Sequence, residues 1–395
     1  MPLSSRPVRS TGTPSPVRSI ARRAVCLPAA TVLLLTVAAC GSDASTSASP
    51  STSSSSSAPT SASAGASPST SASASAPTSS GSQATPAIVA AANAFLATLS
   101  AQEKSTGLFA GDDTTQKRKW SNLPTGLYER SGLAIGDLSQ DQVDAFLAVM
   151  KATLSSEGYN RVMAEWAADD ALAASSGGGG PQLNFGKKYY YIAIIGEPSA
   201  TESWQWQFGG HHVTVNATIH GGDLSLTPSF IGAQPATYTA GGADVRPLGD
   251  IEDDAYALIG SLDDTEKSKA VLGSDYIDLV LGPGKDCMTT QSEGLAGSAM
   301  TADQQAALLT LVNDYGGLAN DEDAKAREAQ LKTDLPQTSF AWYGPTTAGS
   351  AAYFRVTGPH VVIEYSPQSM GGDATEHIHG IYRDPTNDYG GTVCS

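Results

Sequence analysis

The chain has 395 residues, with 39 acidic against 23 basic residues and a formal net charge of −16 at pH 7. This excess of acid argues against nucleic acid or an anionic lipid surface as a partner of the folded part, because both require basic patches. It is compatible with a small ligand or a metal ion. The length allows one large domain or two small ones.

The N-terminus predicts a signal peptide over residues 1–39. This segment contains five arginines and no acidic residue, and it ends in an apolar run over residues 24–39. The run includes Pro28 and is shorter than the roughly 20 apolar residues that a membrane-spanning helix needs. It ends in Val37-Ala38-Ala39-Cys40-Gly41, which resembles the bacterial lipobox.

The lipobox resemblance implies that the chain is cut before Cys40 and that the cysteine is acylated. Acyl chains would anchor the protein in the cell membrane on its extracytoplasmic face. An ordinary secretory signal followed by a chance cysteine is the alternative. Without residues 1–39, the chain would keep 18 basic and 39 acidic residues, a net charge of −21.

Residues 40–85 predict a disordered tether. They are almost entirely Ser, Ala, Thr, Pro and Gly, and Asp43 is their only charged residue. Such a composition buries too little apolar surface to offset the entropy of ordering. The remaining residues, 86–395, form the expected globular part. It contains Cys287 and Cys394, which either form a disulfide in an oxidising compartment or are free buried thiols.

Apolar residues at helical spacing predict several helices. The first begins with Thr85 as its cap and Pro86 in its first turn. Three further helices begin with capping boxes, in which the first side chain binds the backbone three residues later and the second binds back. These pairs are Ser139 with Gln142, Asp263 with Glu266, and Thr301 with Gln304. Another helix is expected over residues 157–172. The recurrence of the capping box has two interpretations: a faint internal repeat, or capping chemistry that unrelated helices share.

Alternating apolar residues predict strands in two groups. The expected strands cover residues 189–195, 204–208, 211–220, 340–343, 353–357, 360–365 and 377–382. We expect one largely antiparallel sheet that contains both groups and is flanked by helices. The predicted fold is therefore a single large module of the α+β class.

Several motifs occur in a fixed order between about residue 90 and residue 394. They are Trp120-Ser121-Asn122-Leu123-Pro124, Gly210-His211-His212, the string from Thr227 to Ala233, Phe340-Ala341-Trp342-Tyr343-Gly344, His377-Ile378-His379, Arg383-Asp384-Pro385 and Asp388-Tyr389-Gly390. Together they resemble the bacterial family catalogued as domain of unknown function 3500. The resemblance implies a secreted or lipoprotein module and no established reaction.

Four of the six histidines are candidate metal ligands. His377 and His379 are two apart on a strand and therefore project from the same face. His211 and His212 project oppositely in a regular strand, so only one should join them unless Gly209 and Gly210 introduce a bulge. Further ligands are expected among four residues: His212, Glu364, Glu376 and Asp384. Such a set suits zinc or copper.

The alternative interpretation is that these histidines are unrelated polar positions in a sheet, hydrogen-bonded to backbone. The other two histidines, His220 and His360, are expected to be turn or surface residues.

Two functions of different classes follow from these patterns. In the first, the histidines hold zinc or copper, and Glu364 or Glu376 acts as general base to a metal-bound water in a hydrolase. In the second, a metal-free module binds a peptide or glycan in an aromatic groove. The groove residues would be Trp204, Trp206, Trp342 and Tyr343, for which core packing is the other interpretation. The chain has neither a Gly-x-Ser-x-Gly elbow nor a glycine-rich phosphate loop after a strand.

Overall fold

The computed structural model describes residues 83–175, 183–370 and 372–394. The expected signal peptide, Cys40 and all but the last residues of the expected tether lie outside these ranges. Helix α1 (Ala84–Thr98) begins before the expected boundary, and its N-cap is Gln83. The predicted cap at Thr85 is therefore wrong, because that residue lies buried inside the first turn. Within the described ranges, no helix has the length and apolar character needed to cross a membrane.

One sheet organises the described residues, as the α+β prediction required. Its main path follows the order β1-β3-β4-β5-β7-β15-β14-β13-β12-β10, and most neighbours are antiparallel. The strands of this path that precede residue 240 are β1 (Leu108–Phe109), β3 (Tyr191–Ile195), β4 (Trp204–Gly209), β5 (Val213–His220) and β7 (Ser229–Ala233). The later strands are β10 (Val271–Gly273), β12 (Ser339–Tyr343), β13 (Tyr353–Gly358), β14 (Val361–Pro367) and β15 (Ile378–Arg383).

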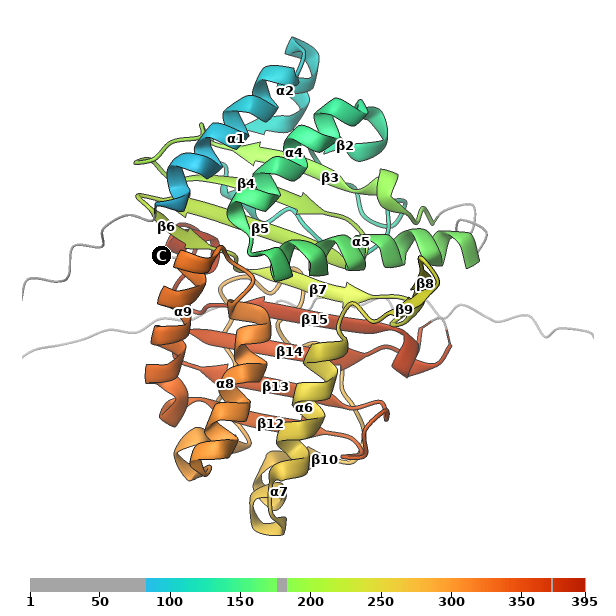
Figure 1. Ribbon diagram of the computed structural model, residues 1–395, viewed down its shortest axis with the longest axis vertical. Helices are drawn as coiled ribbons and strands as arrows, with labels where there is room; N and C mark the ends of the chain where they lie inside the picture. The colour runs from blue at the N-terminus through green and yellow to red at the C-terminus, as the bar shows by residue number, and fades with distance from the viewer. Residues whose placement is uncertain (1–82, 176–182, 371, 395) are drawn as a thin grey trace, which may run out of the picture. The chain divides into compact units, whose positions relative to one another are not determined.

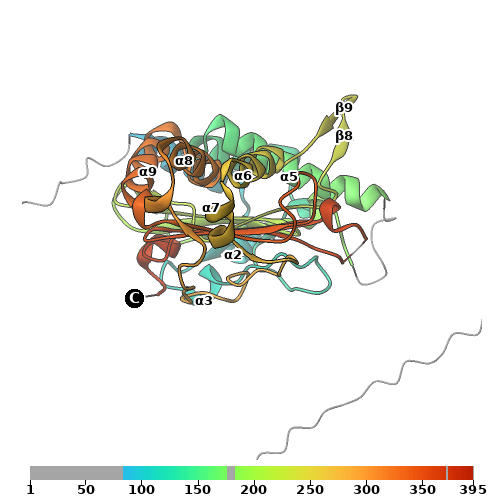
Figure 2. The ribbon, with the colours of Figure 1, turned by 90° about the horizontal axis from the view of Figure 1, so that it is seen from below.

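Short strands complete the sheet at its edges. β2 (Leu133–Ala134) pairs with β3, β6 (Asp223–Ser225) with β5, and β11 (Leu295–Ala296) with β12. A separate hairpin of β8 (Tyr238–Ala240) and β9 (Ala243–Val245) projects on the helical side (Figure 2).

Helices cover one face of the sheet (Figure 1). Three of them lie over the first half of the strands: α1, α4 (Gln140–Thr153) and α5 (Ser156–Ser175). Three others lie over the second half: α6 (Gly249–Ser261), α8 (Ala302–Gly316) and α9 (Asp321–Asp334). The short helices α2 (Ala101–Gly107) and α7 (Asp264–Ala270) follow α1 and α6.

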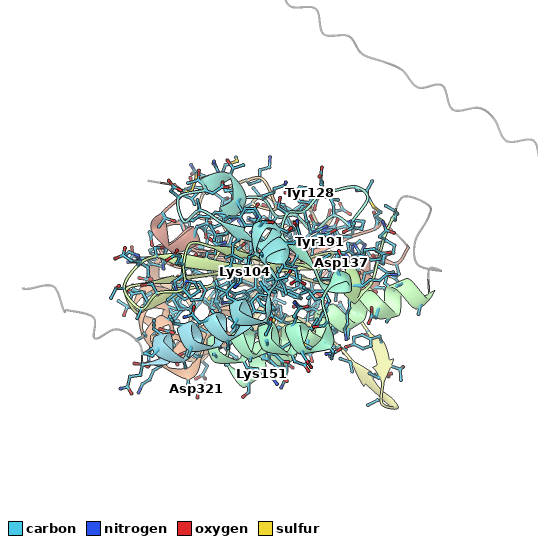
Figure 3. All side chains as sticks on the ribbon, turned by 90° about the horizontal axis from the view of Figure 1, so that it is seen from above. Lys104, Tyr128, Asp137, Lys151, Tyr191 and Asp321 are labelled. Atoms are coloured by element: carbon cyan, nitrogen blue, oxygen red, sulfur yellow. A yellow bond between two sulfur atoms is a disulfide. The ribbon has the colours of Figure 1, made fainter. Side chains whose placement is uncertain are left out.

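The opposite face is covered by two long, mostly irregular segments, residues 110–132 and 274–294 (Figure 2). The first contains the single-turn helix α3 (Thr114–Lys117). Tyr128, in the same segment, lies on the other side of the sheet from Lys151 of α4 (Figure 3). The sheet is therefore enclosed between a helical layer and a loop layer.

The module contains a structural repeat. Apart from α3 and β6, residues 84–233 (the first half) and residues 249–383 (the second half) have the same order of helices and strands, and the sheet order is palindromic about the β7–β15 pair. In the first half, β1 pairs with β3 in parallel and β2 pairs with β3 antiparallel. In the second half, β10 and β11 pair with β12 in the same two ways. The recurrence seen in the sequence is thus a structural repeat.

The repeat extends to individual hydrogen bonds. Gln142 completes the capping box of α4 and donates to the carbonyl of Thr98 at 3.2 Å. Gln304 completes the box of α8 and donates to the carbonyl of Ser261 at 3.1 Å. The three predicted capping boxes are confirmed, and α2 has a fourth with Ser100 at its N-cap.

The tryptophans proposed for an aromatic groove belong to the core. Trp204, Trp206 and Trp342 are each at most 1% exposed. Trp206 donates its indole N–H to Thr153 of α4 at 3.1 Å, and the ring of Trp342 meets that of Tyr256 of α6 edge-on. The groove prediction is wrong for these residues, because the helical layer covers the face from which they project.

Candidate metal centre

The turn between β4 and β5 carries His211 and His212. β4 ends at Gly209 and β5 begins at Val213, so these histidines lie outside the regular strands and the expected alternation does not apply to them. His212 has a φ of 71°, in the left-handed region that non-glycine residues rarely adopt. Such outliers concentrate at functional sites, where the surrounding structure holds them.

A glycine lets this turn approach β7 and β15. Gly232 of β7 pairs with His379 of β15, and a Cβ built on Gly232 would lie 3.0 Å from the carbonyl oxygen of His212. It would also lie 2.7 Å from the carbonyl oxygen of Ile378. The bare backbone at this position therefore allows the turn of the first half to pack against the last strand of the second half.

Three histidines converge where the halves meet. His377 precedes β15 and His379 lies within it, and both project from the same face, as predicted. The Nε2 atom of His377 lies 2.9 Å from Nε2 of His212 and 3.0 Å from Nε2 of His379. We call His212, His377 and His379 the histidine trio. It is one of two groups of potential ligands that the described residues bring together.

The trio is arranged to present unprotonated nitrogens. Nδ1 of His377 lies 2.7 Å from the carbonyl oxygen of Met370, which can only accept, so this nitrogen carries the proton and Nε2 keeps its lone pair. Burial lowers the pKa of His212 and of His379 well below the ordinary value for histidine, and neighbouring histidines lower each further. Burial also lowers the pKa of His377. Neutral imidazole is the form that binds metal ions.

His211 does not join the trio. Its Nδ1 lies 2.7 Å from a carboxylate oxygen of Asp169, which projects from α5. The other oxygen of Asp169 accepts the backbone N–H of Gly186 at 2.8 Å. Tyr190 donates its hydroxyl to the carbonyl of His211. Sequence reasoning missed Asp169, and the available signal was an acidic residue on the buried face of a predicted helix.

The Trp120-Ser121-Asn122-Leu123-Pro124 segment forms the wall beside His379. The amide nitrogen of Asn122 lies 3.5 and 3.4 Å from the two ring nitrogens of His379. Arg130 donates from one guanidinium nitrogen to the carbonyls of Ser121, Leu123 and Gly210, at 2.6 to 2.7 Å. Arg130 therefore ties this motif to the turn that carries the histidines.

The three carboxylates considered as further ligands lie elsewhere. Glu364 accepts the N–H groups of Val280 and Leu281, and the hydroxyl of Tyr353 at 3.0 Å. Its role here is to hold the loop layer on β14.

The other two carboxylates face different surroundings. Glu376 lines a hollow together with Arg246 on the helical side. Asp384 forms an ion pair with Arg327 of α9 at 2.6 Å. None of the three belongs to either group of potential ligands among the described residues.

The remaining residues singled out in the sequence are two histidines and two cysteines, and they lie away from the histidine trio. His220 is exposed at the end of β5, and His360 lies in the β13–β14 turn, 2.6 Å from a carboxylate oxygen of Asp334. His220 is thus a surface residue and His360 a turn residue, and both meet the expectation of turn or surface positions. Cys287 and Cys394 form a disulfide, one of the two alternatives left open by the sequence.

Fold and site together define a duplicated α+β module with buried histidine and aspartate groups that can hold a metal ion. The chain belongs to the family described as "Protein of unknown function (DUF3500)", whose model matches residues 81–391. The predicted family resemblance is thereby confirmed. No curated protein and no solved structure matches the chain.

Proposed function

We propose that this module binds one transition-metal ion, zinc or copper, through the Nε2 atoms of His212, His377 and His379. The observation that carries the proposal is the approach of three imidazole nitrogens at 2.9 and 3.0 Å, on the buried His212 and His377 and the half-buried His379. Ligand atoms around a tetrahedral zinc ion, with bonds of about 2.0–2.1 Å, stand about 3.3 Å apart. A small outward movement of the rings would admit the ion.

The donor set also suggests what the ion would do. Three histidines leave one position of a four-coordinate ion for water or a substrate, which is the arrangement of catalytic rather than structural zinc sites. A bound ion would supply Lewis-acid chemistry at that position, as in a metal-dependent hydrolase. Asn122, beside His379, is the polar side chain placed to contact a molecule there. Glu364 is a poor candidate for a base because its oxygens are occupied.

We further propose that the module is held on the extracytoplasmic face of the membrane through acylated Cys40. The N-terminal pattern of arginines, a short apolar run and the lipobox-like sequence supports this proposal. Membrane fractionation of wild-type and Cys40→Ala protein tests it, since the variant should leave the membrane fraction.

Elemental analysis tests the metal proposal. Untagged protein lacking residues 1–40, purified without chelator and then reconstituted with zinc or copper, should contain at least one ion per chain. His379→Ala should lower the affinity for the ion at least tenfold, because it removes one of three nitrogens. His220→Ala is the matched control, since it removes an exposed histidine and should change nothing. A wild-type protein that stays free of metal after reconstitution would contradict the proposal.

A further inference from the structure

His212 has a second nitrogen that the trio does not use. Its Nε2 faces His377, whereas Nδ1 is buried and has no hydrogen-bond partner among the described residues. The side chain is only 1% exposed, so bulk water does not satisfy this atom. Histidine ligands of metal ions normally engage their other nitrogen with a carboxylate, a carbonyl or water. His377 follows that rule through Met370, and His212 departs from it.

His212 also belongs to a second group of potential ligands. Asp169, His211 and His212 each offer one ligand atom, and the three atoms lie within 4.8 Å of one another. All three residues are buried, with exposures of 1%, 7% and 1%. Two nitrogens and one carboxylate oxygen form a donor set that zinc and copper(II) accept.

The charge of Asp169 favours a cation at this place. A buried carboxylate is normally paired with a cation or coordinates a metal, because removing it from water is costly. Within the described residues, the hydrogen bonds of Asp169 are to the backbone N–H of Gly186 and to Nδ1 of His211. The guanidinium of Arg130 is near enough to interact with Asp169, but its hydrogen bonds go to carbonyl oxygens and to Thr125.

The second half contains a comparison for this pair. His360 lies 2.6 Å from Asp334 at the end of α9, as His211 lies 2.7 Å from Asp169 of α5. The His360–Asp334 pair is part-exposed and belongs to no ligand group among the described residues. The His211–Asp169 pair is buried against His212. A histidine–aspartate contact therefore recurs in both halves, and only the first half adds a buried imidazole with an unused nitrogen.

We propose that Asp169, His211 and Nδ1 of His212 form a second metal position, so that the imidazole of His212 bridges two ions. This inference rests on the proposed function, since the first ion occupies the trio. Binding of the second ion to Nδ1 displaces the proton from that nitrogen to solvent. The ligand class is a divalent transition ion, zinc or copper(II).

Copper(II) titration of metal-free protein lacking residues 1–40 tests the second position. We expect two equivalents in the wild type and one in Asp169→Asn and in His211→Gln, after removal of loosely bound metal. Two copper(II) ions joined by one imidazole are magnetically coupled. The paramagnetic resonance signal of the fully loaded wild type should therefore be smaller than that of two isolated ions, and one uncoupled ion should remain in each variant.

The controls separate this inference from the proposed function. His360→Gln removes the comparable pair of the second half and should keep two equivalents and the coupled signal. One equivalent in both the wild type and Asp169→Asn would overturn the second position and leave the trio intact. Two equivalents in both would also overturn it, and no bound ion in the wild type would overturn both proposals. If Asp169→Asn does not fold, His211→Gln decides the question.

Discussion

Asp314 of α8 shows what burial does to a single ionisable residue of this module. Burial raises the pKa of its carboxyl group to about 7, from an ordinary value of 3.8. The acidic neighbours Asp254, Glu157 and Asp250 raise it further, and Arg161 opposes them. One of its carboxylate oxygens is buried and finds no hydrogen-bond partner in the described part of the chain. The folded protein therefore holds a proton on Asp314 under conditions in which the unfolded chain has released it.

This proton predicts how stability depends on pH. Because the folded pKa lies above the unfolded value, the contribution of Asp314 is fully present below about pH 4 and is lost as the pH rises to about 7. Asp314→Asn should remove this loss and raise the free energy of unfolding at pH 8 by at most about 4 kcal/mol. Urea unfolding of both proteins at pH 5 and pH 8 measures the effect. Asp144→Asn, at an exposed position of α4, should show no such difference between the two pH values.

At the residue scale, the sequence predicted part of the candidate site. The two-residue spacing of His377 and His379 was enough to place them on one face, because strand geometry is local. Whether His211 or His212 joins His377 and His379 depends on a turn in which His212 adopts a positive φ. The alternation of apolar and polar residues does not indicate such a turn. Asp169 lies on a helix and reaches His211 only through the packing of α5 on the sheet, which no local pattern reveals.

At the scale of elements, the duplication makes a quantitative prediction about capping. Gln142 and Gln304 are both buried, and each links its own capping box to the end of the helix that starts its half. Alanine at either position removes the reciprocal cap and leaves a carbonyl without its donor, which should cost about 1–3 kcal/mol. The two costs should be similar, and they should add in the double variant because the sites lie in different halves.

Chemical denaturation of the two single variants and the double variant measures these costs. Gln140→Ala, which changes an exposed residue of the same helix α4, is the control and should cost little. A large cost in one half and none in the other would show that the matching hydrogen bonds do not carry matching energies.

Two of the elements that the sequence missed have weak local signals. Helix α9 buries only Leu331 and Asp334, so its sequence shows little apolar periodicity. β7 is a five-residue strand, Ser229–Ala233, with a glycine inside it, although it is the strand that joins the two halves. Capping boxes and longer alternating strands were found because their chemistry is contained within a few residues. The pairing of β7 with β15 joins distant segments, and it follows from tertiary packing.

At the scale of the whole molecule, the histidine trio straddles the junction of the duplicated halves. His212 comes from the first half, and His377 and His379 come from the second. Within the sheet, the halves meet in one antiparallel pairing, from Ile378 with Ala233 to Tyr382 with Ser229. An ion bound by the trio would therefore connect the halves beside the only strand pair that joins them within the described residues. The candidate site therefore lies at the centre of the palindromic strand order.

Binding of an ion should consequently stabilise the junction more than the edges of the sheet. A ligand present at about 100 times its dissociation constant adds about 2.7 kcal/mol to the free energy of unfolding. Zinc should therefore raise the melting temperature of the wild type by several degrees and raise that of His379→Ala by clearly less. In hydrogen exchange, the amides of β7 and β15 should slow more than those of the edge strands β1 and β10. Equal slowing throughout the sheet, or an equal rise in melting temperature in His379→Ala, would mean that the ion acts away from the junction.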